Sequence, residues 1–254
     1  MIEVKGLSKR FGTTQVLTDI NAKFHRGRVN QIIGKSGSGK SVLAKCIVGL
    51  HVPEEGEVLY EGRSFHAMDR DQKKEIRQEI GMLFQGSALF DSLNVLQNVL
   101  FPLQMFATMS KQDMVERAKF CLKRVNILDK DHLFPSELSG GMQKRVGIAR
   151  AIAMNPKYLF CDEPNSGLDP QTSILIDDLI KEITEEFDIT TIVITHDMNS
   201  VMETGENIIF INQGRKWWEG TKDQLLNSDN TELNEFIFAG GLMRQVKKAM
   251  TGRS

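Results

Sequence analysis

The sequence predicts an α/β fold with a mostly parallel core sheet, an antiparallel β subdomain and an inserted helical subdomain. The runs Tyr158–Cys161 and Thr191–Ile194 are continuously apolar or β-branched, which is typical of parallel strands covered on both faces. Ile32–Ile33 leads into a glycine-rich loop and then into a segment with helical spacing. The opening segment instead alternates apolar and polar residues, as half-buried antiparallel strands do.

The length, charge balance and cysteine content of the chain indicate an ordinary globular protein and disfavour several classes of function. The 254 residues are 41% hydrophobic, enough for a large α/β domain, and 32 basic against 33 acidic residues give a net charge of -1. This balance does not provide the polycationic surface of nonspecific nucleic-acid binding, so we expect no nucleic-acid partner. The three cysteines lack paired spacings and indicate small buried residues rather than disulfides or zinc. No signal peptide or membrane-spanning run is evident, so we expect a partner to provide any membrane attachment.

The first elements follow from apolar spacing. Residues 1–30 and 53–66 are expected to form the antiparallel layer, in which Ile20, Ala22 and Phe24 share one face. The segment after the glycine-rich loop carries apolar residues at helical spacing, at Leu43, Cys46, Ile47 and Leu50. The chain therefore enters a strand, a loop and a helix in immediate succession.

The middle of the chain is expected to be helical from Ile76 to Asn155. Prolines at positions 102, 135 and 156 are interpreted as breaks. About residues 86–157 would form a helical subdomain inserted into a single domain of residues 1–239. Trp217–Trp218 follows a turn and is expected on an edge strand, whereas residues 240–254 could be either a docking helix or a solvated tail.

The loop Gly34–Ser41 has the composition of a phosphate-binding loop. Its glycines let successive backbone N–H groups turn toward one anion, and the following helix adds its positive N-terminal end. Lys40 is expected to reach the β- and γ-phosphates of a nucleotide, and the Ser41 hydroxyl to bind Mg²⁺. The alternative, a glycine turn that merely matches, is disfavoured by the strand and helix around the loop.

Asp162 and Glu163 follow a buried strand, so alternation of side chains sends the two carboxylates in different directions. His196 follows the next strand along the chain, and the carboxyl ends of parallel strands meet at one edge of a sheet. We interpret Asp162 as a ligand of Mg²⁺ through water, and Glu163 as the general base that polarises the attacking water. The alternative is a carboxylate pair that only caps the following helix.

Six motifs occur in the order typical of the ABC-transporter ATPase family. They are Walker A at Gly34–Ser41, the Q-loop at Gln85, the signature at Leu138–Gln143, Walker B at Tyr158–Glu163, the D-loop at Ser166–Asp169 and the switch histidine at His196. The chain resembles this family over about residues 1–225. The resemblance implies ATP hydrolysis.

The resemblance also implies a homodimer with ATP between two chains arranged head to tail, bound by Walker A of one and by the signature of the other. Ser139 with the Gly140 and Gly141 amides begins a helix and would hold the γ-phosphate from the second side. By the same resemblance, Gln85 would sense Mg²⁺ and the water, and His196 would hold the γ-phosphate and orient the general base.

Two positions depart from the family pattern. Phe11 stands where the family usually has a tyrosine that stacks on adenine, and a phenyl face can do the same; the alternative is core packing. Lys35 stands where many relatives have proline and is expected to be tolerated. The residues expected to bind ATP are Phe11, Gly34, Lys35, Ser36, Gly37, Ser38, Gly39, Lys40, Ser41, Ser139, Gly140 and Gly141. Those expected to act in hydrolysis are Lys40, Gln85, Glu163 and His196, and those expected to bind Mg²⁺ are Ser41, Gln85 and Asp162.

A second resemblance lies in Gly86–Leu93, Asn98–Val99, Pro102–Leu103 and Gly141–Arg145. These segments are similar to the ATPase subunit of Mla-type, MCE-associated phospholipid transporters. The similarity implies a subunit on the cytoplasmic face of the inner membrane, attached to an integral-membrane permease and working with an MCE substrate-binding protein. No direct contact with lipid is expected.

Leu89 and Phe90 are expected to be exposed as a hydrophobic socket for the permease; the alternative is that they fill the core of the helical subdomain. Two rival functions stay open: the ATPase of another importer-type or lipoprotein-releasing ABC transporter, and a non-transport ABC ATPase acting on DNA or ribosomes. The second would carry coiled-coil insertions or two cassettes, and neither is evident. A silent nucleotide-binding regulator is disfavoured because the catalytic motif residues are all present.

Overall fold

A six-stranded sheet forms the centre of the molecule. In the computed structural model, which describes residues 1–238, its strands lie in the order β10-β9-β3-β8-β7-β6, and β10 alone runs antiparallel to its neighbour. The bounds are β3 Arg28–Ile33, β6 Ile80–Leu83, β7 Tyr158–Asp162, β8 Thr190–Thr195, β9 Asn207–Asn212 and β10 Arg215–Gly220. Alternate residues of β7 enter different cores, because Leu159 packs with the helices and Phe160 with α1 and the second sheet. The expected two-sided burial is confirmed.

The connecting helices leave the carboxyl ends of the parallel strands at one edge. α1 (Lys40–Ile47) follows β3, α6 (Pro170–Glu186) connects β7 to β8, and α7 (Met198–Thr204) connects β8 to β9. The side chains of Asp169 and Asp197 accept hydrogen bonds from backbone N–H groups in the first turns of α6 and α7. Loops that leave this edge are therefore short and firmly positioned.

An antiparallel sheet covers α1 on its other side. Its order is β2-β1-β4-β5, with β1 Ile2–Phe11, β2 Thr14–Phe24, β4 Glu55–Tyr60 and β5 Arg63–Ser64. Ile2 is paired with both Phe24 and Tyr60, and all three are buried against α1. The expected antiparallel layer is thus present, except that residues 28–30 belong to β3 of the parallel sheet. The turn that precedes β3 ends the antiparallel register.

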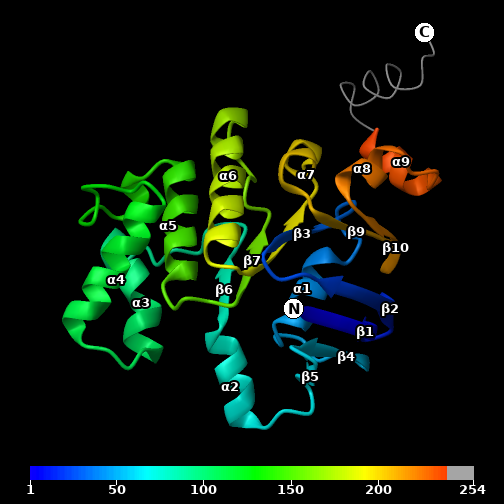
Figure 1. Ribbon diagram of the computed structural model, residues 1–254, viewed down its shortest axis with the longest axis horizontal. Coiled ribbons are helices and arrows are strands. Elements are labelled where there is room, and N and C mark those ends of the chain that lie inside the picture. Colours follow the sequence, from blue (N-terminus) through cyan, green and yellow to red (C-terminus); the bar gives the residue numbers. More distant parts are fainter. Residues whose placement is uncertain (239–254) are drawn as a thin grey trace.

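Helices α3 (Val95–Phe106), α4 (Lys111–Arg124) and α5 (Gly140–Ile152) pack on one another at one side of the molecule, and the antiparallel sheet lies at the other (Figure 1). A shorter helix, α2 (Arg70–Gln78), precedes β6. The expectation of continuous helix from residue 76 is wrong at β6, a four-residue edge strand paired with β7. Pro102 lies inside α3 and does not end it, because the helix continues through the buried Leu103.

The last described elements, α8 (Lys222–Leu226) and α9 (Thr231–Ile237), pack beside β10. Trp217 and Trp218 lie half-buried on this edge strand, as expected. Residues 240–254, expected to be either a docking helix or a solvated tail, lie outside the described residues. Within residues 1–238, no helix has the length and apolar character needed to cross a membrane.

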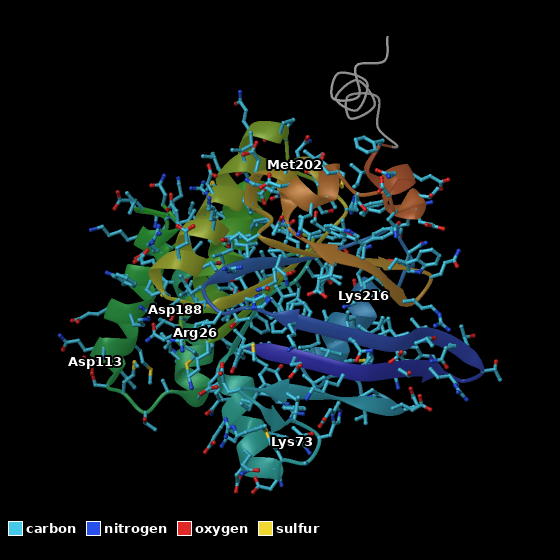
Figure 2. The ribbon with its side chains drawn as sticks, turned by 45° about the vertical axis from the view of Figure 1, so that its right-hand side comes forward. Arg26, Lys73, Asp113, Asp188, Met202 and Lys216 are labelled. Atoms are coloured by element: carbon cyan, nitrogen blue, oxygen red, sulfur yellow. The ribbon has the colours of Figure 1, made fainter. Side chains whose placement is uncertain are left out.

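Charged side chains cover the outside of the described chain. Asp113 points away from the ribbon, the Lys73 ammonium donates to the His66 carbonyl oxygen at 3.1 Å, and Arg26 and Asp188 lie side by side (Figure 2). The Arg26 Nε atom is 2.8 Å from the Asp188 Oδ2 atom, and this ion pair joins the turn before β3 to the turn before β8. Because both side chains are exposed, the pair adds little stability.

Candidate active site

The glycine-rich loop runs from the end of β3 to the start of α1. Gly34 has φ of 150°, and a Cβ atom there would lie 2.1 Å from the Ile211 carbonyl oxygen of β9, so only glycine fits. The Lys40 ammonium is buried and donates to the backbone oxygens of Gly34 at 2.8 Å and Lys35 at 3.0 Å. Burial lowers the pKa of Lys40, while the Glu163 and Asp162 carboxylates act in the opposite direction.

This loop fits a phosphate group. Gly39 begins α1 without a side-chain cap, so no side chain satisfies the first N–H groups of the helix. The Ser38 hydroxyl is buried and has no hydrogen-bond partner among the described residues. Lys35, Ser36 and Gly37 are exposed around it. The free N–H groups at the start of α1, the Ser38 hydroxyl and the Lys40 ammonium therefore all belong to the one loop that would hold the phosphate.

Asp162 ends β7 and faces the same loop. Its Oδ1 atom lies 3.5 Å from the Ser41 hydroxyl. Burial raises the pKa of Asp162, as does the neighbouring Glu163, while Lys45, Ser41 and Lys40 lower it. A hydroxyl beside a carboxylate is an oxygen donor set that suits Mg²⁺, which usually keeps several waters and substrate oxygens as its other ligands.

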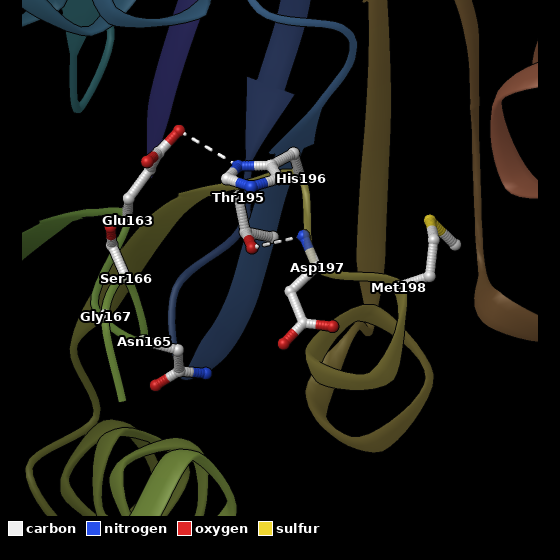
Figure 3. Close-up of a pocket in the computed structure, with 8 residues that line it drawn as sticks. All are labelled: Glu163, Asn165, Ser166, Gly167, Thr195, His196, Asp197 and Met198. Carbon is white, nitrogen blue, oxygen red and sulfur yellow. Dashed lines mark hydrogen bonds and ion pairs between the residues drawn. The ribbon is translucent and has the colours of Figure 1, made fainter. Parts of the chain in front are cut away.

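The carboxylates of Glu163 and Asp162 have different partners, as expected, but the cause is a left-handed turn at Glu163, with φ of 47° after the last residue of β7, rather than strand alternation. The Gln85 Nε2 atom donates to Glu163 Oε2 at 2.8 Å, and the His196 Nδ1 atom lies 3.1 Å from Glu163 Oε1. Figure 3 shows Glu163 and His196 facing each other. The structure thus brings together three predicted catalytic side chains, which follow the ends of β6, β7 and β8.

A cavity of about 410 Å³ opens beside this carboxylate (Figure 3). It is lined by Glu163, Asn165, Ser166, Gly167, Thr195, His196, Asp197 and Met198. Four of these lie in the segment between β7 and α6, and the other four run from the last residue of β8 to the first residue of α7. The cavity therefore lies between the two segments that carry Glu163 and His196.

Asp177 of α6 forms hydrogen bonds with residues near both of these segments. It was not predicted from the sequence as a site residue. It is 5% exposed and accepts hydrogen bonds from Asn165 Nδ2 and Ser200 Oγ, both at 2.8 Å. Burial raises the pKa of Asp177 to about 6, against the effect of these two hydrogen bonds. An acidic residue beside Ile176, on the apolar face of α6, was the available signal.

Lys144 of α5 was also not predicted. It is 5% exposed, and its ammonium donates to the backbone oxygen of Gln85 and, at 3.4 Å, to that of Glu163. Burial lowers the pKa of Lys144. A lysine between Gly141 and Gly147, on the buried face of the helix, was the signal in the sequence.

The signature residues lie apart from the glycine-rich loop. Ser139 begins α5, and its Oγ atom accepts from the Met142 N–H at 3.3 Å. Ser139 and Gly140 are exposed, and no hydrogen bond among the described residues joins residues 139–141 to residues 34–41. In Figure 1, α6 stands between α5 and α1. A single chain does not bring these two predicted ATP-binding segments together.

Phe11 lies at the end of β1 and is 44% exposed, so the core-packing alternative is wrong. Its ring meets that of His51 edge to face, with centroids 5.2 Å apart, and Lys9 Nζ lies 5.1 Å from the ring centroid. One ring face remains suited to stacking.

An apolar groove of about 430 Å³ lies between α2, β6, α3 and α5. Phe84, Phe90 and Phe106 line it and are 40%, 41% and 49% exposed. The Phe90 ring is also tilted against Phe101, with centroids 4.6 Å apart. Leu89, expected to be exposed, is instead half-buried against the helical core. The exposed phenylalanines of the groove therefore come from two segments, the connection between β6 and α3, and α3 itself.

Comparison with known proteins agrees with this geometry. A model of the ABC transporter family matches residues 17–166. The methionine import ATP-binding protein MetN of Clostridium acetobutylicum is 38% identical over 237 residues, which cover 93% of this chain and 74% of the relative. The probable ribonucleotide transport ATP-binding protein mkl of Mycobacterium leprae is 35% identical over 236 residues, which cover 93% and 68%.

Solved structures show the same fold. The protein cbiO1 from Clostridium perfringens, part of the ABC transporter complex cbiONQ, has a TM-score of 0.84 and 29% identity over 98% of each chain. A dimeric ATP-binding cassette in a post-hydrolysis state, bound to ADP and Pi, has a TM-score of 0.78 and 35% identity, covering 87% of this chain and 98% of its own. The predicted fold class is confirmed. The chain belongs to the ABC transporter family, as an ATP-binding and ATP-hydrolysing cassette.

Proposed function

We propose that this chain is the energising subunit of a transporter, working as a pair of identical chains that bind a separate permease. The observation that carries the proposal is the Glu163 carboxylate, held between Gln85 and His196 at the strand edge that also presents Lys40. We assign residues 1–239 to one ATPase domain with a helical subdomain at about 86–157, and residues 240–254 to a tail.

ATP would be held by the glycine-rich loop, with Lys40 at its phosphates and Phe11 at its adenine. Ser41, Gln85 and Asp162 would hold Mg²⁺, which neutralises developing charge on the phosphates when bound. Ser41 and Asp162 already lie together, and the amide oxygen of Gln85 is not used in its hydrogen bond to Glu163. A hydroxyl, a carboxylate and an amide oxygen form a donor set that suits Mg²⁺.

Glu163 would take the proton of the attacking water. The Gln85 amide orients one carboxylate oxygen by donating to it, and the His196 ring orients the other. After hydrolysis the proton leaves the carboxylate with the products.

The second chain would supply the signature. Ser139 and Gly140 are exposed at a helix start, with Gly141 buried behind them, and no hydrogen bond among the described residues joins them to the glycine-rich loop of their own chain, so this helix start is suited to an anion held elsewhere. The dimeric cassette found among similar structures supports this arrangement. Closure of the two chains around ATP would then drive the conformational change of the permease.

The apolar groove would receive the permease. Three exposed phenylalanines in one groove form a contiguous apolar surface of the kind that marks a protein contact. We infer attachment at the cytoplasmic face of the inner membrane through this contact. The chain itself would not touch the transported substrate.

For the substrate we propose phospholipid, with an MCE substrate-binding protein as a further partner. Support comes from the segments at Gly86–Leu93 and Gly141–Arg145. A second candidate is a small-solute importer, and its support is the naming of relatives for methionine and ribonucleotide transport. Neither candidate changes the assignment of the ATPase residues.

Copurification from native membranes tests these proposals together. The chain should bring down a permease and an MCE protein, and lipid extraction followed by mass spectrometry should find bound phospholipid. Phe90→Ser with Phe106→Ser should abolish capture of the permease, whereas Phe120→Ser, an exposed phenylalanine on α4 outside the groove, should not. A permease captured with a solute-binding protein and no lipid would replace the phospholipid proposal by the importer. Capture that survives loss of both groove phenylalanines would refute the docking site.

A further inference from the structure

Side chains on one face of α5, the helix that begins at the signature, form hydrogen bonds with the main chain of residues 85–88, the glutamine loop. The Lys144 ammonium donates to the Gln85 carbonyl oxygen, and the two arms of the Arg150 guanidinium donate to the carbonyls of Ser87 and Ala88, each at 2.8 Å. Lys144, Gly147 and Arg150 are spaced three residues apart, so they lie along one face of the helix. Side chains of α5 thus occupy three carbonyl groups within four residues of the loop.

The approach of α5 to this loop is close. A Cβ atom at Gly147 would lie 2.7 Å from a methyl carbon of Leu83 and 3.6 Å from the Cβ atom of Ser87. A side chain at position 147 would therefore require the Leu83 side chain to move. Figure 1 shows α5 alongside β6, the strand that leads into the loop.

These hydrogen bonds matter because two residues of the loop have an unfavourable backbone conformation. Ser87 has φ of 60° and Ala88 has φ of 46°, in the left-handed region that residues with a Cβ atom rarely occupy. A conformation of this kind persists only where surrounding contacts enforce it. The hydrogen bonds from Arg150 end on these two residues.

Lys144 also reaches the second catalytic loop. Its ammonium lies 3.4 Å from the backbone oxygen of Glu163, the residue whose carboxylate receives the Gln85 amide at 2.8 Å. Glu163 too has a left-handed backbone, with φ of 47°. One buried ammonium therefore touches the main chain of both residues whose side chains meet beside the cavity.

We propose that Lys144 is a positioning residue for ATP hydrolysis. By binding the main chain of Gln85 and of Glu163, it sets the geometry in which the amide meets the carboxylate, and Arg150 keeps the adjoining turn in place. This role rests on the hydrolytic function proposed for Glu163. Its consequence is that α5, which begins at the signature, and the glutamine loop move as one unit.

The test compares three variants of the full chain. Lys144→Met keeps the length of the side chain and removes its charge and donors, and Lys144→Arg restores both. Arg145→Met is the matched control, because Arg145 on the same helix donates at 2.9 Å to the carbonyl of Asn126, beyond the end of α4, and does not touch the glutamine loop. Steady-state ATP hydrolysis gives kcat and KM for each.

We expect Lys144→Met to lower kcat by at least about tenfold, because a small misplacement of a catalytic group has effects of this size or more. KM and nucleotide binding should stay within about twofold, since Lys40 and its loop are untouched. Lys144→Arg should recover most of the kcat, and Arg145→Met should behave as wild type. If Lys144→Met prevents folding, Lys144→Gln, which keeps a donor on a shorter stem, is measured instead.

Hydrogen exchange provides a readout independent of activity. Amides of residues 85–90 should exchange several times faster in Lys144→Met than in wild type, with no change in Arg145→Met. Unchanged exchange with unchanged kcat would overturn the proposal, as would an equal loss of kcat in Arg145→Met. If Glu163→Gln hydrolyses ATP like wild type, the proposed function fails, whereas the exchange data still decide whether Lys144 holds the loop.

Discussion

At the level of single residues, Glu163 and Asp162 show how one peptide unit separates two functions. Asp162 is the last residue of an extended strand, whereas Glu163 has φ of 47° and donates its N–H to the Ile194 oxygen at 2.9 Å. The left-handed turn costs about 1 kcal/mol or more. It sends one carboxylate toward Ser41 and the other toward His196. Two adjacent acids therefore meet two different environments.

Glu163→Gln should allow ATP to bind and should stop its hydrolysis. The amide fills the same space and can keep a hydrogen bond to Gln85, but it cannot accept the proton of water, so phosphate release should fall by about a hundredfold or more. ATP should then hold two chains together, and light scattering should detect a dimer that persists with ATP and dissolves with ADP. Continued steady hydrolysis would refute the role of Glu163 as general base.

At the level of elements, the Asp177 side chain links α6 to α7 and to the residue that precedes the D-loop. Its carboxylate accepts from Asn165 and Ser200, and burial raises its pKa to about 6, with smaller contributions from Asp197 and Asp178 in the same direction. In the unfolded chain an aspartate titrates near pH 4. The ionised form is therefore disfavoured in the folded state. The associated stability is present below about pH 4 and is lost as the pH rises through about 6.

Asp177→Asn removes this titration while keeping the shape of the side chain. Relative to the variant, wild type should gain up to about 3 kcal/mol in the free energy of unfolding between pH 7 and pH 4. Urea unfolding of both proteins at several pH values measures the difference. The pH-dependent part of this difference reports the titration of Asp177, and its constant part reports the change of the side chain. A difference that stays constant with pH would contradict the buried carboxylate.

Elements with a strong local pattern were predictable from the sequence, and those defined by tertiary contacts were not. β7 and β8 are buried on both faces and so read as apolar runs. β6 has only four residues, too few to show a period, and Pro102 was read as a break although packing continues α3 through it.

The candidate site divides in the same way. Gly34–Ser41, Asp162–Glu163 and His196 follow strands directly, so their order along the chain predicts their meeting at one edge. Lys144 and Asp177 have charged side chains on helices, which in a sequence indicate a solvated face. Only the fold shows that each is buried and paired with loop atoms of the site.

At the level of the whole molecule, the proposed function gives each chain two separate half-sites, the glycine-rich loop and the signature. Lys40 and the signature are not joined within one chain, and the proposed dimer would complete two sites from four halves. Activity would then depend on protein concentration.

Mixing two inactive variants tests this arrangement. Lys40→Ala disables one half-site, and Gly140→Asp places a negative charge at the signature without crowding, since a Cβ atom there meets only Leu168 at 3.5 Å. Each variant alone should be nearly inactive. An equal mixture should recover roughly a quarter of wild-type hydrolysis, because half of the dimers would hold one intact site out of two. A mixture as inactive as its parts would refute shared sites.

The groove and the glutamine loop share one side chain, Arg150. Its guanidinium lies 5.7 Å from the Phe90 ring centroid at the groove, and its two arms bind the carbonyls of Ser87 and Ala88. A small apolar molecule lodged in the groove would displace this guanidinium and loosen the loop. Such an inhibitor would lower the maximal rate at every ATP concentration, and no excess of nucleotide would compete it away.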